Sequence, residues 1–350
     1  MTGPLSLRFR EELSALGLAE RGRPLVVAVS GGLDSCVLLH LLHFSTPEIP
    51  LVVAHFDHGM RPTSASDAAW VRGVCRAWDV PCVTGVAEVP VRSEDEARRA
   101  RYTYLESVVA DRDGYGLCTA HHADDQAETV LFRILRGAGL AGLRGIPAER
   151  APGVYRPLLP FWREELQEYA SAVGLSWRED ATNEHLGFAR NAIRHDVLPR
   201  AERAVAPGAR EALVHLAGLA AENERAWAAV LPDLFERIDL VELEDGSRSF
   251  DHAALLTLDS SLTTRIIRNL AEVVGRPLGR QLSGQVVTFA VSGRSGGRVA
   301  LGGGMEIRRE LDRVVLGPTA TTAEERPLVI LDPGPGSGEA GVGGRSVHVA

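Results

Sequence analysis

Residues 24–35 read PLVVAVSGGLDS, a segment that joins an apolar run to a pair of glycines and then to a polar helix start. The apolar part, residues 24–30, is rich in β-branched side chains, which is typical of a strand buried on both faces. Residues 34–44 carry leucines at helical spacing. The sequence here therefore predicts a strand, a tight turn and a helix in direct succession.

The same alternation of strand and helix continues to about residue 136. Further strands are predicted at 50–54, 81–86 and 116–120, and helices at 66–79, 94–110 and 124–136. Because such alternation favours parallel pairing through right-handed crossovers, the expected fold class is α/β with a doubly wound, mostly parallel sheet. Ligands on these sheets bind beyond the carboxyl ends of the strands, so functional residues are expected just after each strand.

The sequence changes character in its second half. Residues 209–235 and 262–274 predict helices, and residues 298–316 predict a hairpin that turns at the three glycines 302–304. The expected parts are an α/β domain over 1–199, a second, smaller α-rich domain over 200–318, and a tail over 319–350 that is partly disordered or a linker because it is rich in Pro and Gly.

The composition excludes several classes of function. The chain is 45% hydrophobic and can bury a full core, but a net charge of −8 argues against coating nucleic acid through charge alone. All 38 residues counted as Lys or Arg are arginines, which rules out a Walker-type lysine and Schiff-base chemistry. The four cysteines form no CxxC pair, so we expect buried thiols and neither zinc nor an iron–sulfur cluster. No apolar run could span a membrane and no secretory signal is present, so a cytoplasmic location is predicted.

The turn at residues 30–35 is suited to hold phosphates. Two glycines allow the backbone to approach a ligand, and the serine hydroxyls and the free N–H groups of the helix start can donate to an anion. Asp34 would repel phosphates unless it holds Mg²⁺ that bridges their oxygens. The simpler interpretation is an Asp that caps a helix after a glycine turn.

Ser-Gly-Gly-x-Asp-Ser between a first strand and a first helix resembles the signature of the PP-loop ATP pyrophosphatases, which cleave ATP between its α- and β-phosphates. The resemblance implies ATP as co-substrate and Mg²⁺ held by Asp34 through the phosphates. The second strand runs into HFDHGMR, residues 55–61, which resembles a segment of lysidine synthetases and tRNA thiolases. A hydrogen-bonded turn is the alternative for His58. The residues implied to bind ATP are Ser30, Gly31, Gly32, Leu33, Asp34, Ser35, His55 and Asp57.

Residues 121–129 read HHADDQAET and follow the fourth predicted strand. They resemble the His-x-x-Asp-Asp-x-x-Glu-Thr block of the tRNA(Ile)-lysidine synthetases. On a helix Asp125 and Glu128 share a face, and the resemblance implies that they bind the substrate lysine, whose ammonium relieves their repulsion. In the alternative interpretation, Asp124 caps the helix and Glu128 pairs with a surface arginine.

The same resemblance implies three catalytic residues: Asp34, Arg101 and His121. Arg101 lies in EARRARY, residues 96–102, which resembles the Ala-Arg-x-x-Arg-Tyr helix of the family. A guanidinium can clamp an oxyanion through paired hydrogen bonds, and Arg98 is the second choice for this role.

Contacts with tRNA are assigned to two arginines. Arg190 and Arg194 lie in RNAIR, residues 190–194, which resembles a block of the same family and suits RNA phosphates. RPLL at residues 156–159 also resembles a stretch of the family. Between residues 133 and 210 about 12 arginines stand against about 9 acidic residues, so a basic surface is expected here despite the acidic total.

The resemblance implies a ligase. The C2 carbonyl oxygen of cytidine 34 in the CAU anticodon of tRNA(Ile) would attack the α-phosphorus of ATP, pyrophosphate would leave, and the ε-amine of L-lysine would then displace AMP. The alternatives are a PP-loop tRNA thiolase and a non-catalytic ATP- or RNA-binding module. A homodimer is left open. Lysidine synthetases often carry a further C-terminal domain, so we expect either a short form or a chain without that domain.

Overall fold

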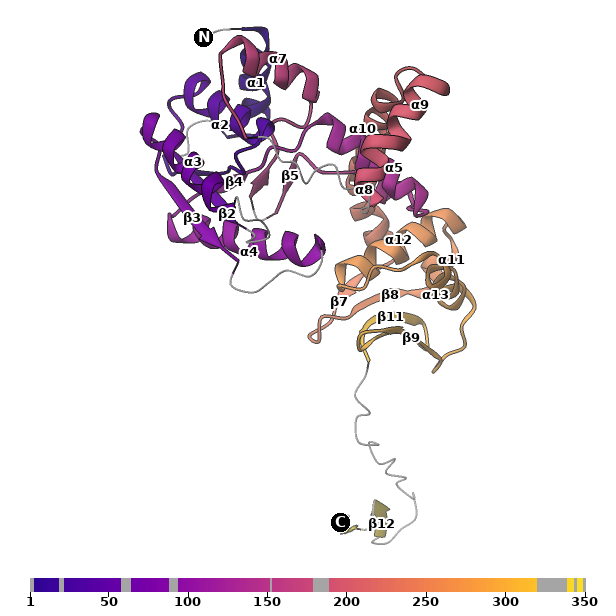
Figure 1. Ribbon diagram of the computed structural model, residues 1–350. Helices are drawn as coiled ribbons and strands as arrows, with labels where there is room; N and C mark the ends of the chain where they lie inside the picture. The colour runs from indigo at the N-terminus through magenta and orange to yellow at the C-terminus, as the bar shows by residue number, and fades with distance from the viewer. Residues whose placement is uncertain are drawn as a thin grey trace. The chain divides into compact units, whose positions relative to one another are not determined.

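The computed structural model describes residues 3–18, 22–57, 64–87, 94–151, 153–178, 189–319, 339–342 and 345–348. The chain divides into two compact units, Met1–Arg225 and Ala226–Ala350 (Figure 1). Each unit has a hydrophobic core of its own. The sequence places a domain boundary between residues 199 and 200. Whether the chain folds as independent domains on either side of that point stays a prediction.

A six-stranded sheet forms the centre of the first unit. Its order is β3-β2-β1-β4-β6-β5, and every pair is parallel except β5 with β6. The strands are β1 (Leu25–Ala28), β2 (Leu51–Asp57), β3 (Cys82–Val86), β4 (Gly116–Cys118), β5 (Glu149–Arg150) and β6 (Val154–Tyr155). The predicted doubly wound, mostly parallel sheet is confirmed, and the antiparallel β5 is an edge strand that was not predicted.

The helices that alternate with these strands lie close to their predicted ranges. They are α2 (Leu33–Ser45), α3 (Ser64–Ala77), α4 (Glu94–Asp111) and α5 (Ala123–Leu135). Two further helices, α1 (Pro4–Ala15) and α7 (Arg163–Ala172), pack against α2.

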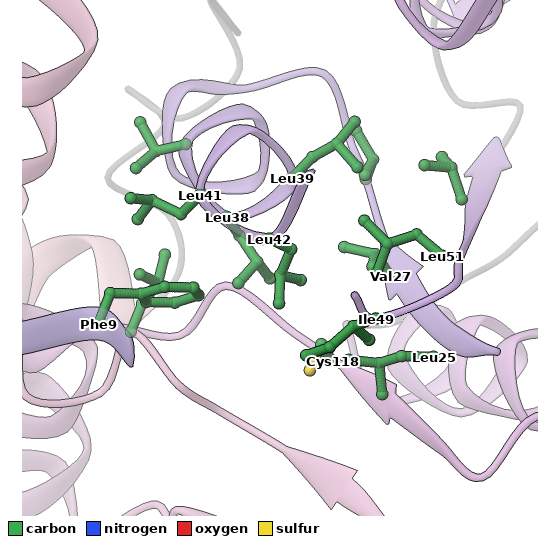
Figure 2. Close-up of a cluster of buried hydrophobic side chains, with 14 of the residues drawn as sticks. Phe9, Leu25, Val27, Leu38, Leu39, Leu41, Leu42, Ile49, Leu51 and Cys118 are labelled. Atoms are coloured by element: carbon green, nitrogen blue, oxygen red, sulfur yellow. The ribbon is translucent and has the colours of Figure 1, made fainter. Parts of the chain in front are cut away.

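Strand β1 packs apolar side chains on both of its faces. Leu25 and Val27 are buried with the leucines of α2 (Figure 2), whereas Val26 is buried on the opposite face with α4. A fully buried leucine or valine stabilises a fold by roughly 1.5–3 kcal/mol relative to an exposed one. The strand is therefore fixed from both sides, which in turn fixes the start of the glycine turn that follows it.

The strand order reverses at β1, which lies between β2 and β4. The chain runs outward from β1 through β2 to β3 and then returns to β4 on the other side of β1. Such a reversal is where doubly wound sheets bind ligands, beyond the carboxyl ends of the two strands. The segments that follow these strands, residues 29–35 and 119–125, therefore share this edge of the sheet.

A group of helices follows β6 in the first unit. They are α8 (Ala189–Ala192), a π-helix (Ile193–Val197), α9 (Leu198–Ala204) and the first part of α10 (Ala209–Arg237), whose residues 226–237 belong to the second unit; the short α6 (Leu140–Leu143) precedes β5. Ala127 of α5 packs with Ile193 and Leu198 in a small separate core. This packing brings the arginine-bearing segment 190–194 against α5, as the site geometry below confirms. π-helical turns are uncommon and frequently lie at functional sites.

The second unit combines helices with an antiparallel sheet. Its helices are α11 (His252–Leu256), α12 (Ser260–Val273) and α13 (Arg280–Ser292), and its sheet has the order β7-β8-β11-β10-β9. The strands are β7 (Val241–Glu242), β8 (Arg248–Asp251), β9 (Arg298–Gly302), β10 (Met305–Glu310) and β11 (Arg313–Pro318). The predicted hairpin turn is confirmed, since residues 302–304 all have positive φ. The expectation of a mainly helical domain with one hairpin was incomplete, because the hairpin belongs to a five-stranded sheet.

The described part of the tail has regular structure. Strands β12 (Glu339–Val342) and β13 (Arg345–His348) pair antiparallel. Residues 320–338, which hold most of the predicted Pro/Gly-rich linker, lie outside the described residues.

Candidate nucleotide and lysine site

The turn after β1 is braced from inside by Ser35. Its Oγ accepts hydrogen bonds from the N–H groups of Ser30 (3.2 Å) and Gly31 (3.3 Å) and donates to the carbonyl of Gly32 (3.0 Å). Gly31 has a φ of +96°, a conformation that only glycine adopts without strain. The predicted loop residues are thus brought together, with Ser35 shaping the turn from within and Ser30 exposed at its rim.

Helix α2 begins directly after this turn and presents its unpaired N–H groups. The first intrahelical bond runs from Cys36 N to Gly32 O, so Leu33, Asp34 and Ser35 have no intrahelical acceptor. These donors and the helix dipole favour an anion at the start of the helix. The predicted phosphate cradle therefore has the required backbone geometry.

Asp34 connects the turn to the rest of the site. Its Oδ2 lies 3.7 Å from His122 Nε2, and its Oδ1 lies 3.8 Å from Arg163 Nε. Among the described residues Oδ1 has no hydrogen-bond partner although that atom is buried. A buried carboxylate oxygen without a donor is suited to a hard cation such as Mg²⁺.

The buried side chain of His122 is surrounded by three carboxylates. Besides Asp34, its ring nitrogens lie 3.4 Å from Asp124 Oδ2 and 3.6 Å from Asp125 Oδ2, and its side chain is only 3% exposed. Burial alone would lower the pKa of His122, but the three carboxylates outweigh it and raise the pKa to about 10. The backbone of His122 also begins α5, where its N–H donates to Asp125 Oδ2 (3.2 Å). One imidazolium therefore ties the glycine turn to the start of α5.

Asp125 and Glu128 share one face of α5, as their spacing predicts, and both face arginines. Arg194 Nη2 lies 2.9 Å from Asp125 Oδ1, and its Nε donates to Glu128 Oε1. Arg190 Nε lies 3.2 Å from Glu128 Oε2. Glu128 is 1% exposed, so this ion-pair cluster is largely shielded from water. The structure thus joins the two residues expected to bind lysine to the two expected to bind tRNA.

His121 and Arg101 lie beside this cluster. Thr119 Oγ1 and His121 Nδ1 form a hydrogen bond of 2.9 Å. Burial lowers the pKa of His121 to about 3; Asp125 opposes this shift, and Arg156, Arg101 and Arg98 add to it. Burial also lowers the pKa of Arg101. His121 is therefore uncharged at neutral pH, in contrast to its neighbour in the sequence.

His55 and Asp57 stand near the carboxyl end of β2. The ring of His55 is buried, and its Nδ1 donates to the carbonyl of Val29 at 2.8 Å, which fixes the end of β1. Asp57 is half-buried at the last position of the strand. The remainder of the HFDHGMR segment, residues 58–61, lies outside the described residues. The roles of both residues in nucleotide binding stay predictions.

A cavity of about 600 Å³ opens beside His122 and α5. Its volume lies within the usual range of small-molecule sites. Side chains of both charges line it, among them Glu128, Glu164, Arg163 and Arg194. A zwitterionic ligand such as an amino acid can find partners for both of its charges on such walls.

Sequence reasoning missed two arginines of the site. Arg163, at the start of α7, faces Asp34, and Arg210 Nη1 lies 2.7 Å from Asp124 Oδ1. Neither belongs to a motif that adjoins the turn or α5 in sequence, so only the folded arrangement reveals them. The alternative role of Asp124 as a helix cap is not what the structure shows, because the backbone N–H that Asp124 accepts from is that of Arg163 (2.9 Å).

The fold and the glycine turn at its strand reversal define a PP-loop protein, and the PP-loop domain family matches residues 5–201. The chain is 35% identical over 301 residues to the tRNA(Ile)-lysidine synthase of Solibacter usitatus, which is 85% of this chain and 68% of that protein. It is 35% identical to the same enzyme of Symbiobacterium thermophilum and 37% identical to that of Thermus thermophilus, over 84% and 93% of this chain. The chain therefore belongs to the tRNA(Ile)-lysidine synthase family.

The chain spans only part of the length of these relatives. The chain spans 64% of the Symbiobacterium protein and 61% of the Thermus protein. A solved structure, the U34-tRNA thiolase NcsA from Methanococcus maripaludis with its [4Fe-4S] cluster, matches 61% of this chain and 78% of its own with a TM-score of 0.50. At 17% identity this likeness shows a shared fold alone. Within the described residues, no helix is both long and apolar enough to cross a membrane.

Proposed function

We propose that this protein is a ligase that adenylates C2 of cytidine 34 in the CAU anticodon of tRNA(Ile) and then replaces AMP by L-lysine, forming lysidine. Family membership supports the use of ATP. The observation that carries the proposal is the link through His122 between the phosphate cradle at Asp34 and the acidic pair on α5. A single site thus holds a place for a nucleotide next to a place for an ammonium group.

The turn at residues 30–35 binds the β- and γ-phosphates of ATP in this proposal. Attack by the C2 carbonyl oxygen on the α-phosphorus releases pyrophosphate, whose charge develops at the start of α2. Backbone N–H groups and the helix dipole stabilise that charge without having to reorganise. Arg101 and the uncharged His121 both interact electrostatically with Asp125, and the target base would be placed next to them.

Asp34 is the residue of the turn that would hold Mg²⁺. Its buried, unpartnered Oδ1 fits a hard cation. Among the described residues no three His, Cys, Asp or Glu side chains form a metal-binding group, in keeping with an ion held by one carboxylate and the phosphates. The ion would neutralise charge on the phosphates of ATP.

Lysine is assigned to Asp125 and Glu128, and RNA phosphates to Arg190 and Arg194. In this structure both arginines form ion pairs with the carboxylates to which the lysine ammonium would bind. Arginines that turn from the carboxylates to RNA phosphates free the carboxylates for lysine, so the binding of tRNA and of lysine is coupled. Calorimetry with lysine should then show tighter binding when tRNA is present, and equal affinity with and without tRNA would contradict this exchange.

The activity is tested by incubating the protein with radiolabelled lysine, ATP and tRNA(Ile) that carries a CAU anticodon. We expect lysine in acid-precipitable RNA, and none with a CAU-bearing methionine tRNA or without ATP. Sulfur transfer without lysine would show a thiolase instead. ATP binding without turnover would show a non-catalytic module. The cytoplasmic location stays a prediction, and the homodimer stays open.

A further inference from the structure

Four arginines surround the ring of Tyr102 on α4. The guanidinium carbons of Arg98, Arg101 and Arg150 lie 5.1 Å, 5.6 Å and 4.7 Å from the ring centroid. The fourth, Arg156, follows β6 and interacts electrostatically with Tyr102, whose buried hydroxyl has no hydrogen-bond partner among the described residues. These residues come from two distant segments, so the fold and not a local sequence run gathers them. They are called the arginine basket below: Arg98, Arg101, Arg150, Arg156 and Tyr102.

Donor groups of the basket are buried without acceptors. Arg156 is 2% exposed, and its Nη1 donates to the carbonyl of Pro147 at 2.6 Å, but its Nε has no partner among the described residues. The Nε of Arg150 is likewise buried and without a partner there. Buried donors are nearly always hydrogen-bonded in folded proteins, so two such atoms in one cluster point to a missing acceptor.

Two acidic groups of the described residues act on the basket. Glu106 lies 3.2 Å from Arg150 at the exposed side, and Asp125 acts electrostatically on Arg101. Burial alone would raise the pKa of Tyr102, but Arg98, Arg156 and Arg101 outweigh it and lower the pKa. The guanidinium groups repel one another, while each cation–π contact with Tyr102 contributes about 0.5–1 kcal/mol.

The basket borders the proposed active site. Arg156, Arg101 and Arg98 all act on His121, the residue that follows β4 and Thr119. Tyr102 itself packs against β1, β2, β4 and β6 through the core on this face of the sheet. Arg98 is exposed and Arg150 is half-buried, so the basket opens to solvent on its Arg98 side.

We propose that the arginine basket binds one phosphate group during catalysis: a backbone phosphodiester next to cytidine 34 or the phosphate of free pyrophosphate. The proposal rests on the proposed function for the identity of the RNA. Arginine suits this ligand because its planar fork donates two parallel hydrogen bonds to a phosphate. The turn at residues 30–35 already takes the phosphates of ATP, so the observations favour the RNA phosphodiester.

The test compares Arg150→Gln and Arg98→Gln with Arg99→Gln, a neighbour on α4 that is exposed and lies outside the basket. Binding of tRNA(Ile) is measured by filter binding over a range of KCl concentrations. Binding of inorganic pyrophosphate is measured by calorimetry on full-length protein saturated with α,β-methylene ATP, which occupies the glycine turn.

For an RNA phosphodiester, each basket variant lowers the slope of log K against log salt by about 1, whereas Arg99→Gln leaves it unchanged. For free pyrophosphate, each basket variant weakens pyrophosphate binding by about tenfold and leaves the salt slope unchanged. If neither quantity differs between the basket variants and Arg99→Gln, the proposal is wrong. A wild-type protein that binds either probe through the basket but attaches no lysine would refute the proposed function and leave the anion site standing.

Discussion

At the scale of single residues, His122 carries the electrostatic organisation of the site. Its position within HHADDQAET indicates no more than closeness to a reacting group, since a lone sequence cannot show which carboxylates surround an imidazole. The fold brings Asp34 from the glycine turn to within 3.7 Å and adds two aspartates from α5. Three negative charges next to one buried ring keep that ring protonated.

His122 gives the protein a specific pH dependence. Its pKa is about 10 in the folded state against 6.5 in the unfolded state, so the folded state binds the extra proton between these values. Stability from this residue is full below pH 6.5 and falls by about 1.4 kcal/mol per pH unit as the pH rises through that window. His121, with a pKa of about 3, acts oppositely and removes stability as the pH falls below 6.5.

The check is urea unfolding at pH 7, 8 and 9, followed by tryptophan fluorescence. Four of the five tryptophans, Trp70, Trp78, Trp162 and Trp177, lie in the first unit, so this signal reports mainly on it. We expect the midpoint to fall steadily in the wild type and to be nearly constant in His122→Gln. Parallel pH profiles for the two proteins would contradict the assignment.

Asp34→Asn tests the phosphate cradle. The amide keeps the shape of the side chain but removes the charge that would hold Mg²⁺ and that faces His122. Loss of one preorganised charge at a reacting phosphate typically lowers the rate by roughly 10²–10³. We therefore expect pyrophosphate release to fall by at least that factor when it is measured on folded protein well below the urea midpoint of the variant; an unaltered release rate would exclude Asp34 from the reaction.

Glu128→Gln tests the ammonium site. The substitution removes a buried negative charge that now faces Arg190 and Arg194. We expect the KM for lysine to rise by about tenfold or more, because a charge-assisted hydrogen bond contributes roughly 1.5–3 kcal/mol, while the KM for ATP stays within about twofold. Glu211→Gln, at an exposed position of α10, is the matched control. An unchanged lysine KM would show that Glu128 only pairs with the arginines.

At the scale of elements, the sequence was most informative where periodicity and glycine placement agree. The first strands and helices of the sheet were predicted because β-branched runs and leucine spacing alternate without interruption. Two-residue strands such as β5 and β6 are too short to leave a pattern. The π-helix at Ile193–Val197 is fixed by packing of Ile193 against α5, which is a tertiary effect.

The candidate site was predictable in part for the same reason. The turn and the start of α5 follow directly after strands, so their residues could be named before their contacts were known. The alternative that Glu128 pairs with an arginine is confirmed, but its partners Arg190 and Arg194 could not be named from the sequence, because more than 60 residues separate them from Glu128. Arg150, Arg163 and Arg210 were missed for the same reason.

The glycine turn provides a matched pair of substitutions. Gly31 has a φ of +96°, so Gly31→Ala forces an alanine into a strained conformation, at a cost of about 1–3 kcal/mol. Gly32 has a φ of −75°, and its added Cβ would lie 3.6 Å from Ser30 Oγ, an ordinary contact. We expect Gly31→Ala to lower the free energy of unfolding by that amount and Gly32→Ala by well under 1 kcal/mol. Equal losses in urea titrations would show that the turn is not strained at Gly31.

At the scale of the whole molecule, the first unit contains every residue assigned here to ATP, lysine and the reacting base. The PP-loop match ends at residue 201, within that unit. The second unit has its own core and sheet, and the sequence revealed only its helices and hairpin because its remaining strands are short and polar. Net charge is −8, so the proposed recognition of tRNA would depend on local arginine clusters such as those at α8 and the basket.

The central claim is that one site couples cleavage of ATP to attachment of lysine. The most direct measurement is the ratio of pyrophosphate released to lysine incorporated, taken in one reaction with ATP, lysine and tRNA(Ile) bearing a CAU anticodon. The proposed chemistry predicts one pyrophosphate for each lysine and little pyrophosphate when tRNA is omitted. Lysine attached without matching pyrophosphate, or no pyrophosphate from the complete mixture, would contradict it.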